Sequence, residues 1–210
     1  MLTLNEIKNL AVLCFSYTIF VSNPELMRRT ELINQLIKDT QLMKSEVKEM
    51  MQLDEEILNF KPSENSWSAL ESIEHLNIAD AHYLAQFGLK VPENGTHEKD
   101  DFKSGWIGGY FVRAMKPKSD GTIPSPMKTF SKFMPSAVVQ LDTLAKFVDD
   151  QDLILTYLKR SSSLNLNRIK IPSAIGAIVT FKLGDAFSFL IAHNQRHIIQ
   201  AKSAIQAFQG

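Results

Sequence analysis

Apolar residues recur at helical spacing along most of the chain, and polar stretches divide the pattern into segments. From residue 24 to about residue 57 an apolar stripe repeats every seven residues, with two further members beside it: Leu36, Met43, Met50 and Ile57, with Ile33 and Val47. A stripe of this length is typical of a long helix packed in a bundle. Pro24 and Glu25 suit the first turn, so we expect the helix to begin there. Its methionines, Met43, Met50 and Met51, are interpreted as core side chains rather than metal ligands.

A second helix is predicted for residues 68–89. The proline and polar cluster of residues 60–65 end the first helix. Ser68, followed three residues later by Glu71, is the signature of a capping box and predicts the start of the helix. Its apolar side carries Ile73, Leu76, Tyr83, Leu84 and Phe87. His75 lies about 100° or more to one side of that stripe, and His82 follows close to the same face.

The middle of the chain, residues 91–131, is predicted to be irregular. It holds four of the eight prolines and five of the nine glycines. A loop of this length is uncommon inside a compact domain, and it is either a binding loop or a crossover between two helix pairs. His97 lies in this stretch and is predicted to be solvated.

The helical pattern returns in two more segments. Residues 131–160 show it through Val138, Leu141, Leu144, Ala145 and Val148, with an acidic run at 149–152 that either interrupts the helix or forms a solvated turn. Residues 164–171 alternate like a short strand, but Pro172 follows and no partner strand is evident, so an extended connector is favoured. The last helix is predicted from residue 181 or 184 to residue 208.

Composition narrows the class of protein. The 210 residues fit one domain, and the 23 basic and 23 acidic residues cancel, which argues against nucleic acid as a partner. Cys14 is the single cysteine, so no internal disulfide can form and no Cys-x-x-Cys motif is present. A reducing, cytoplasmic location is therefore expected.

The N-terminal 23 residues are expected to be an extension of uncertain role, ahead of a bundle domain at 24–210. Residues 10–21 (LAVLCFSYTIFV) form a mostly apolar run. This run is shorter than the about 20 residues that a membrane span needs, so no membrane partner is expected. It could also be the core of a signal peptide, but Glu6 offsets Lys8 and no small-residue cleavage site follows.

Two histidines in the last helix carry the strongest chemical signal. His193 and His197 stand four residues apart, so they lie on one face, one turn apart. Both fall on the apolar stripe and are predicted to point into the bundle. A buried imidazole without a partner costs roughly 1–3 kcal/mol, so each ring requires a hydrogen bond or a metal. The spacing suits a shared metal ion, as in zinc-binding helices, but a third ligand is not evident from spacing alone.

Two stretches of the chain resemble the DinB-like family, also called YfiT-like. One is Trp67-Ser68-x-x-Glu71-x-x-x-His75-Leu76, and the other is His193-x-x-Arg196-His197-x-x-Gln200. The resemblance covers roughly residues 25–208. It implies an all-α fold, a four-helix bundle with a long crossover loop. It also implies a divalent metal ion, zinc or nickel, held by His75, His193 and His197.

The resemblance further implies a metal-dependent enzyme that acts on a small-molecule substrate, either as a hydrolase or as a transferase of a low-molecular-weight thiol. Gln200, Asp80 and His82 are candidates for groups around the metal ligands, whereas Glu74 and Arg196 are predicted to be solvated. Two alternatives remain open: a non-catalytic metal- or ligand-binding bundle of stress-response type, and a bundle whose metal only ties two helices together. A homodimer is compatible with the fold.

Overall fold

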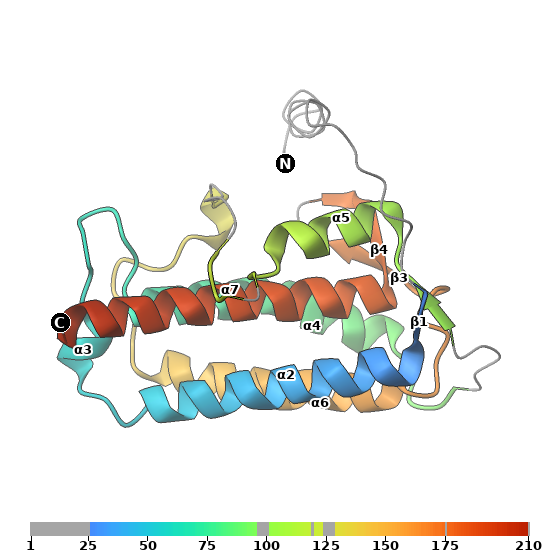
Figure 1. Ribbon diagram of the computed structural model, residues 1–210, viewed down its shortest axis with the longest axis horizontal. Helices are drawn as coiled ribbons and strands as arrows, with labels where there is room; N and C mark the ends of the chain where they lie inside the picture. The colour runs from blue at the N-terminus through green and yellow to red at the C-terminus, as the bar shows by residue number, and fades with distance from the viewer. Residues whose placement is uncertain (1–25, 96–100, 119, 124–128, 175, 210) are drawn as a thin grey trace.

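Four long helices form the body of the molecule (Figure 1). The structure is a computed structural model that describes residues 26–209 except 96–100, 119, 124–128 and 175. The long helices are α2 (Arg29–Met50), α4 (Ala69–Lys90), α6 (Asp142–Ser161) and α7 (Leu183–Gln209). Both α2 and α4 pack against α6 and α7. The predicted all-α fold is confirmed, with two small two-stranded sheets added to it.

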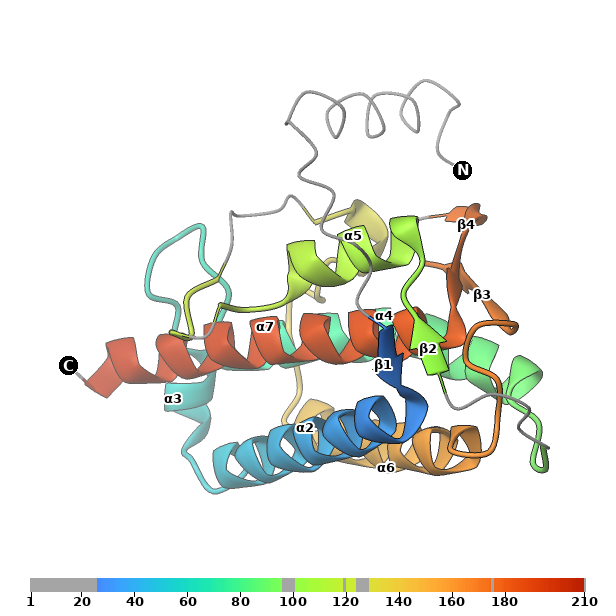
Figure 2. The ribbon, with the colours of Figure 1, turned by 45° about the vertical axis from the view of Figure 1, so that its right-hand side comes forward.

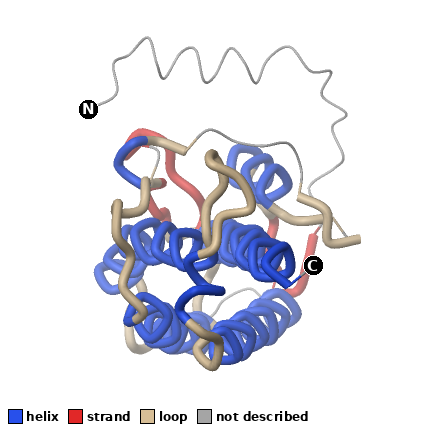
Figure 3. The backbone as a smooth tube through the Cα atoms, turned by 90° about the vertical axis from the view of Figure 1, so that its left-hand side faces the viewer, coloured by secondary structure: helices blue, strands red, loops and turns tan. Residues whose placement is uncertain are grey.

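The long helices lie in two layers, with α4 and α7 in one and α2 and α6 in the other (Figures 1 and 3). The core between them is built from the stripes that the sequence predicts. All of the α2 stripe is buried, namely Ile33, Leu36, Met43, Val47 and Met50. On α4, Ile73, Leu76, Tyr83 and Phe87 are buried too. Met51 is 44% exposed, so its interpretation as a core residue was wrong.

The first helix is shorter than predicted. Pro24 and Glu25 lie outside the described residues, and the next three form strand β1 (Leu26–Arg28). The helix ends at Met50, and Ile57 belongs to a separate short helix, α3 (Glu55–Asn59). The last turn is closed by hydrogen bonds of the 3₁₀ type, in which a backbone N–H donates to the carbonyl three residues earlier, as Gln52 N–H does to Glu49. The seven-residue repeat therefore continues across a break in the helix.

The described parts of residues 91–131 contain more secondary structure than predicted. Strand β2 (Asp101–Lys103) pairs antiparallel with β1, and helix α5 (Trp106–Met115) follows it and packs on α7. A short 3₁₀ helix, η1 (Ser131–Phe133), closes the stretch. Glycine has a low helix propensity, so its presence did not suggest a helix here. In α5 a glycine instead allows the helix to pack closely on α7. A Cβ on Gly108 would lie 2.6 Å from the side chain of Asp185 on α7.

The third long helix begins at Asp142, eleven residues later than predicted. Val138 and Leu141 precede it and are 73% and 45% exposed. The acidic run at 149–152 does not interrupt the helix, and Asp150 pairs with Lys146 one turn earlier at 2.5 Å. The true apolar face is Leu144, Phe147, Ile154, Leu155 and Leu158, only the first of which the sequence analysis identified.

The stretch before the last helix is a hairpin rather than an extended connector. Strand β3 (Lys170–Ser173) pairs antiparallel with β4 (Gly176–Lys182), and Ile171 stands opposite Phe181. The partner strand was missed because it runs without interruption into α7. Among the described residues, no helix has both the length and the apolar character that crossing a membrane requires.

The predicted capping box at the start of α4 is present. Ser68 Oγ accepts a hydrogen bond from Glu71 N–H at 3.2 Å, and the Glu71 carboxylate accepts one from Ser68 N–H at 2.9 Å. These bonds satisfy two backbone donors that a helix start leaves unpaired. They also determine where the helix begins and thereby where His75 lies, two turns further along.

Replacing Ser68 by alanine is expected to lower the free energy of unfolding by about 1 kcal/mol, because the cap is lost. The control is Ser203→Ala, an exposed serine that bonds only the Ile199 carbonyl of its own helix. That change should stay within about 0.5 kcal/mol. Urea unfolding followed by circular dichroism measures both, and equal effects would contradict the stabilising role of the cap.

Candidate metal centre

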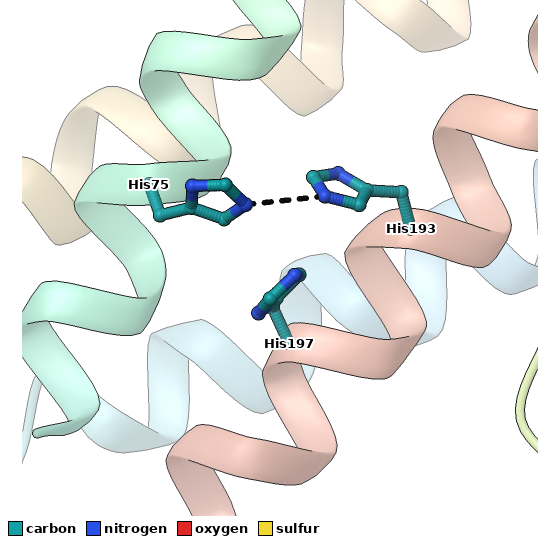
Figure 4. A group of neighbouring side chains, drawn as sticks. All are labelled: His75, His193 and His197. Atoms are coloured by element: carbon teal, nitrogen blue, oxygen red, sulfur yellow. Dashed lines mark hydrogen bonds between the residues drawn. The ribbon is translucent and has the colours of Figure 1, made fainter. Parts of the chain in front are cut away.

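Three histidines from two neighbouring helices converge at the interface of α4 and α7 (Figure 4). His75 comes from α4, and His193 and His197 come from one face of α7. The Nε2 atoms of His75 and His193 are 3.2 Å apart. One nitrogen from each of the three rings lies within 4.8 Å of the other two.

This geometry fits a divalent metal ion. Zinc–imidazole bonds of 2.0–2.1 Å at tetrahedral angles place ligand nitrogens about 3.3 Å apart. The spacing of 3.2 Å between His75 and His193 is close to that value. In the other two pairs of rings the ligand nitrogens are at most 4.8 Å apart. Small rotations of the rings would bring these nitrogens to the spacing that zinc needs.

Hydrogen bonds orient two of the rings. Nδ1 of His75 donates to the backbone carbonyl of Phe133 at 2.7 Å, and Nδ1 of His197 donates to Gln200 Oε1 at 3.0 Å. A proton on each Nδ1 leaves the lone pair on Nε2, the atom that faces the centre. Metal-binding histidines are usually held in this way by a carbonyl or carboxamide on the far nitrogen.

Burial keeps the three rings neutral. His75 and His193 are 4% and 8% exposed, and His197 is partly exposed. Desolvation lowers the pKa of His75, partly offset by its bond to Phe133. It lowers the pKa of His197 to about 3 and that of His193 well below its usual value, with the neighbouring rings and Arg196 adding to both. Neutral imidazole is the form that binds a metal.

Aromatic rings and one cation surround the histidines. The Trp67 ring lies 4.9 Å from His75 and 5.9 Å from His197, and Phe189 stacks nearly parallel on His193 at 6.1 Å. Arg196 is only 6% exposed, so its prediction as a solvated residue was wrong. Its charge disfavours protonation of His193 and His197. Glu74 is partly buried and accepts hydrogen bonds from the backbone and hydroxyl of Ser136.

The other candidate residues have partners of their own. Gln200 contacts the group directly through His197. His82 instead bonds the carbonyl of Pro172 at 3.0 Å and packs edge-on against Tyr83. Asp80 lies about 140° round α4 from His75, given 100° per residue, and accepts a hydrogen bond from Asn194. His97 lies outside the described residues.

Asp80 belongs to a buried polar cluster that sequence reasoning missed. Asn194 Nδ2 donates to Asp80 Oδ2 at 2.8 Å, and the side chain of Gln151 from α6 lies close to this carboxyl group. All three side chains are fully buried. Burial raises the pKa of Asp80 to about 8, and the hydrogen bond from Asn194 and the nearby amide of Gln151 only partly oppose this. Gln151 sits within an acidic run, where nothing in the sequence sets it apart as a core residue.

A bundle of long helices with three inward-facing histidines defines the class of protein, and a sequence comparison identifies the family. The sequence model of the DinB superfamily matches residues 47–201. The chain therefore belongs to the DinB superfamily. The match includes all three histidines and Gln200. Comparisons with curated proteins and with solved structures each found no match.

The raised pKa of Asp80 predicts that stability falls with rising pH. Between about pH 4 and pH 8 the folded chain holds a proton on Asp80 that the unfolded chain has released. The free energy of unfolding should therefore decrease by up to about 1.4 kcal/mol per pH unit across this window and level off above it. Asp80→Asn should remove this slope and be the more stable form at pH 8. Urea unfolding from pH 4 to pH 9 measures it.

Asp142→Asn is the control, because Asp142 is an exposed carboxylate on α6. It should retain the slope of the wild type. A slope in Asp80→Asn equal to that of the wild type would show that Asp80 is charged in the folded chain.

Proposed function

We propose that this chain binds one divalent metal ion, zinc or nickel, through Nε2 of His75, His193 and His197. The observation that carries the proposal is the orientation of the rings. The bonds to Phe133 and Gln200 place the protons of His75 and His197 on the far nitrogens. The lone pairs of these two rings are thus directed at a point that they share with His193. The aromatic rings of Trp67 and Phe189 lie beside this point. A cation there would replace the hydrogen bond between His75 and His193 and bind all three rings at once.

We further propose that the centre is catalytic, in a hydrolase or in a transferase that moves a low-molecular-weight thiol onto a small-molecule electrophile. Three neutral histidines suit zinc or nickel and leave at least one coordination position for water or substrate. A metal bound there would act as a Lewis acid and lower the pKa of a coordinated water or thiol.

The side chains of this protein would support such a reaction in three ways. Phe133 and Gln200 hold two rings in position. Trp67 and Phe189 limit water around them, which strengthens electrostatic interactions. Arg196 adds a positive charge beside His193 and His197, which favours an anionic nucleophile. A homodimer and a cytoplasmic location remain predictions from the sequence alone.

A non-catalytic role for the metal has one observation in its favour. His75 and His193 are 4% and 8% exposed, as expected of a metal that ties α4 to α7. A cavity of 180 Å³ near the start of α4 is lined by Ser68, Glu71 and residues 137–140, not by the histidines. The other alternative, a non-catalytic metal- or ligand-binding bundle of stress-response type, does not require that the metal tie the two helices together.

The purified protein is expected to contain one zinc or nickel ion per chain, measured by plasma mass spectrometry. Alanine at His75, His193 or His197 should abolish stoichiometric metal, whereas Gln200→Leu should weaken the affinity by about 10–100-fold. His82→Ala is the control, because His82 bonds Pro172 instead. A metal-free wild type, together with a His193→Ala variant that takes up metal as well as the wild type does, would refute the site.

An open coordination position separates the catalytic role from the structural one. Protein loaded with Co²⁺ is titrated with 2-mercaptoethanol, and a sulfur-to-cobalt charge-transfer band is expected if a thiol reaches the metal. His82→Ala should show the same band. A spectrum that does not change at saturating thiol would favour the structural role, even if the metal content is as predicted.

A further inference from the structure

Helix α5 presents an apolar face to the outside of the molecule. Trp106, Ile107 and Tyr110 are 69%, 41% and 43% exposed, and we call these three residues the outer face of α5. On the opposite side, Phe111 packs against Phe181 at 5.7 Å and Phe189 at 6.3 Å. The helix is thus apolar all round, with Arg113 as its one charged residue. Helices of this kind are normally buried on every side.

The outer face cannot turn inward, because α5 is held at its start by α7. Asp185 accepts hydrogen bonds from Gly105 N–H at 2.8 Å and from the Ser104 hydroxyl at 2.5 Å. The same carboxylate leaves no room for a Cβ at Gly108. Something outside the described residues would have to cover the outer face if it is covered at all.

The chain that precedes the described residues joins the molecule beside this face. Strand β1 begins at Leu26, which pairs with Lys103, and Lys103 is three residues ahead of Trp106. Figure 2 shows β1 and β2 side by side, with the start of α5 next to them. Leu26 itself is 65% exposed, so an exposed apolar side chain also stands where that segment enters the described part of the chain.

Residues 10–21 are the apolar run of that preceding segment, and only residues 22–25 separate it from Leu26. Four residues span at most about 14 Å, so the run is tethered close to α5. A short tether gives an effective concentration in the millimolar range, so an intrinsic dissociation constant of about 1 mM is enough for docking. A second molecule would need to be present at a similar concentration to compete.

We propose that residues 10–21 dock on the outer face of α5 and cover Trp106, Ile107 and Tyr110. The N-terminal segment is then part of the folded domain rather than an appendage. The proposal does not depend on the metal centre. Two other occupants would give different results in the experiments below: a second copy of the chain, and a lipid surface.

Cys14 lies within the proposed docking segment and is the single cysteine of the chain, so it can report on docking by disulfide formation. A second cysteine is placed on the outer face (Ile107→Cys) and, in two controls, on other exposed apolar positions (Leu42→Cys and Leu89→Cys). The control positions are 60% and 80% exposed. Intact mass first confirms that residues 1–25 are present, and the chains are then oxidised with diamide at about 1 µM. At this concentration two thiols of the same chain meet far more often than thiols of different chains.

The expected result is an intramolecular disulfide in Ile107→Cys that forms on the order of tenfold or more faster than in either control. Equal rates at all three positions would show that the segment does not dock, and would overturn the proposal. Disulfide-linked dimers as the main product of Ile107→Cys would assign the face to a second copy.

A second measurement leaves the native cysteine as the only thiol. Cys14 should react with a thiol reagent on the order of tenfold slower than a free thiol, because a thiol reacts only where it is accessible. Trp106→Ser should restore fast reaction, whereas Leu89→Ser, its control, should not. Fast reaction in the wild type would overturn the proposal. Binding to phosphatidylcholine vesicles that shifts the tryptophan emission of the wild type to the blue, but not that of Trp106→Ser, would also overturn the proposal, because lipid would then be the occupant.

Discussion

Histidine rings lie in the middle of the interface between α4 and α7, and the rest of the candidate centre depends on this interface. His75 and His193 meet there with Nε2 atoms 3.2 Å apart, largely out of water. A rotation of either helix by one residue, about 100°, would separate the rings. The capping box at Ser68 sets the start of α4, and β4 leads directly into α7. Both devices therefore serve the alignment of three side chains.

The same interface contains a second polar contact one residue away. Next to His193, Asn194 turns to Asp80, which also meets Gln151 of α6. Consecutive residues of a helix point about 100° apart, so α7 can meet a histidine with one residue and a carboxyl group with the next. A buried carboxyl group stabilises less than an apolar side chain would, and its hydrogen bond to Asn194 is available only in this alignment of the helices.

The environment of the histidines agrees with a metal centre in either role. Low pKa values, aromatic neighbours and a buried Arg196 all disfavour protons on the rings. The burial of the rings also strengthens the attraction between a bound cation and its ligands or an anionic substrate, because little water screens them. Membership of the DinB superfamily is shown by the sequence match. The reaction, by contrast, depends on whether a coordination position is open.

Features that depend on nearby residues were predictable from the sequence by itself. The capping box, the stripes of α2 and α4 and the turn-to-turn spacing of His193 and His197 involve hydrogen bonds or periodicity within a few residues. His75 was found through resemblance to a family, because its position beside the apolar stripe favours no particular role. Tertiary structure alone decided the features that depend on distant partners. The bond of His75 to the carbonyl of Phe133 has no signal in the sequence. Helix α5 can pack on α7 because Gly108 leaves room for Asp185. The burial of Asp80 follows from where α6 and α7 meet it.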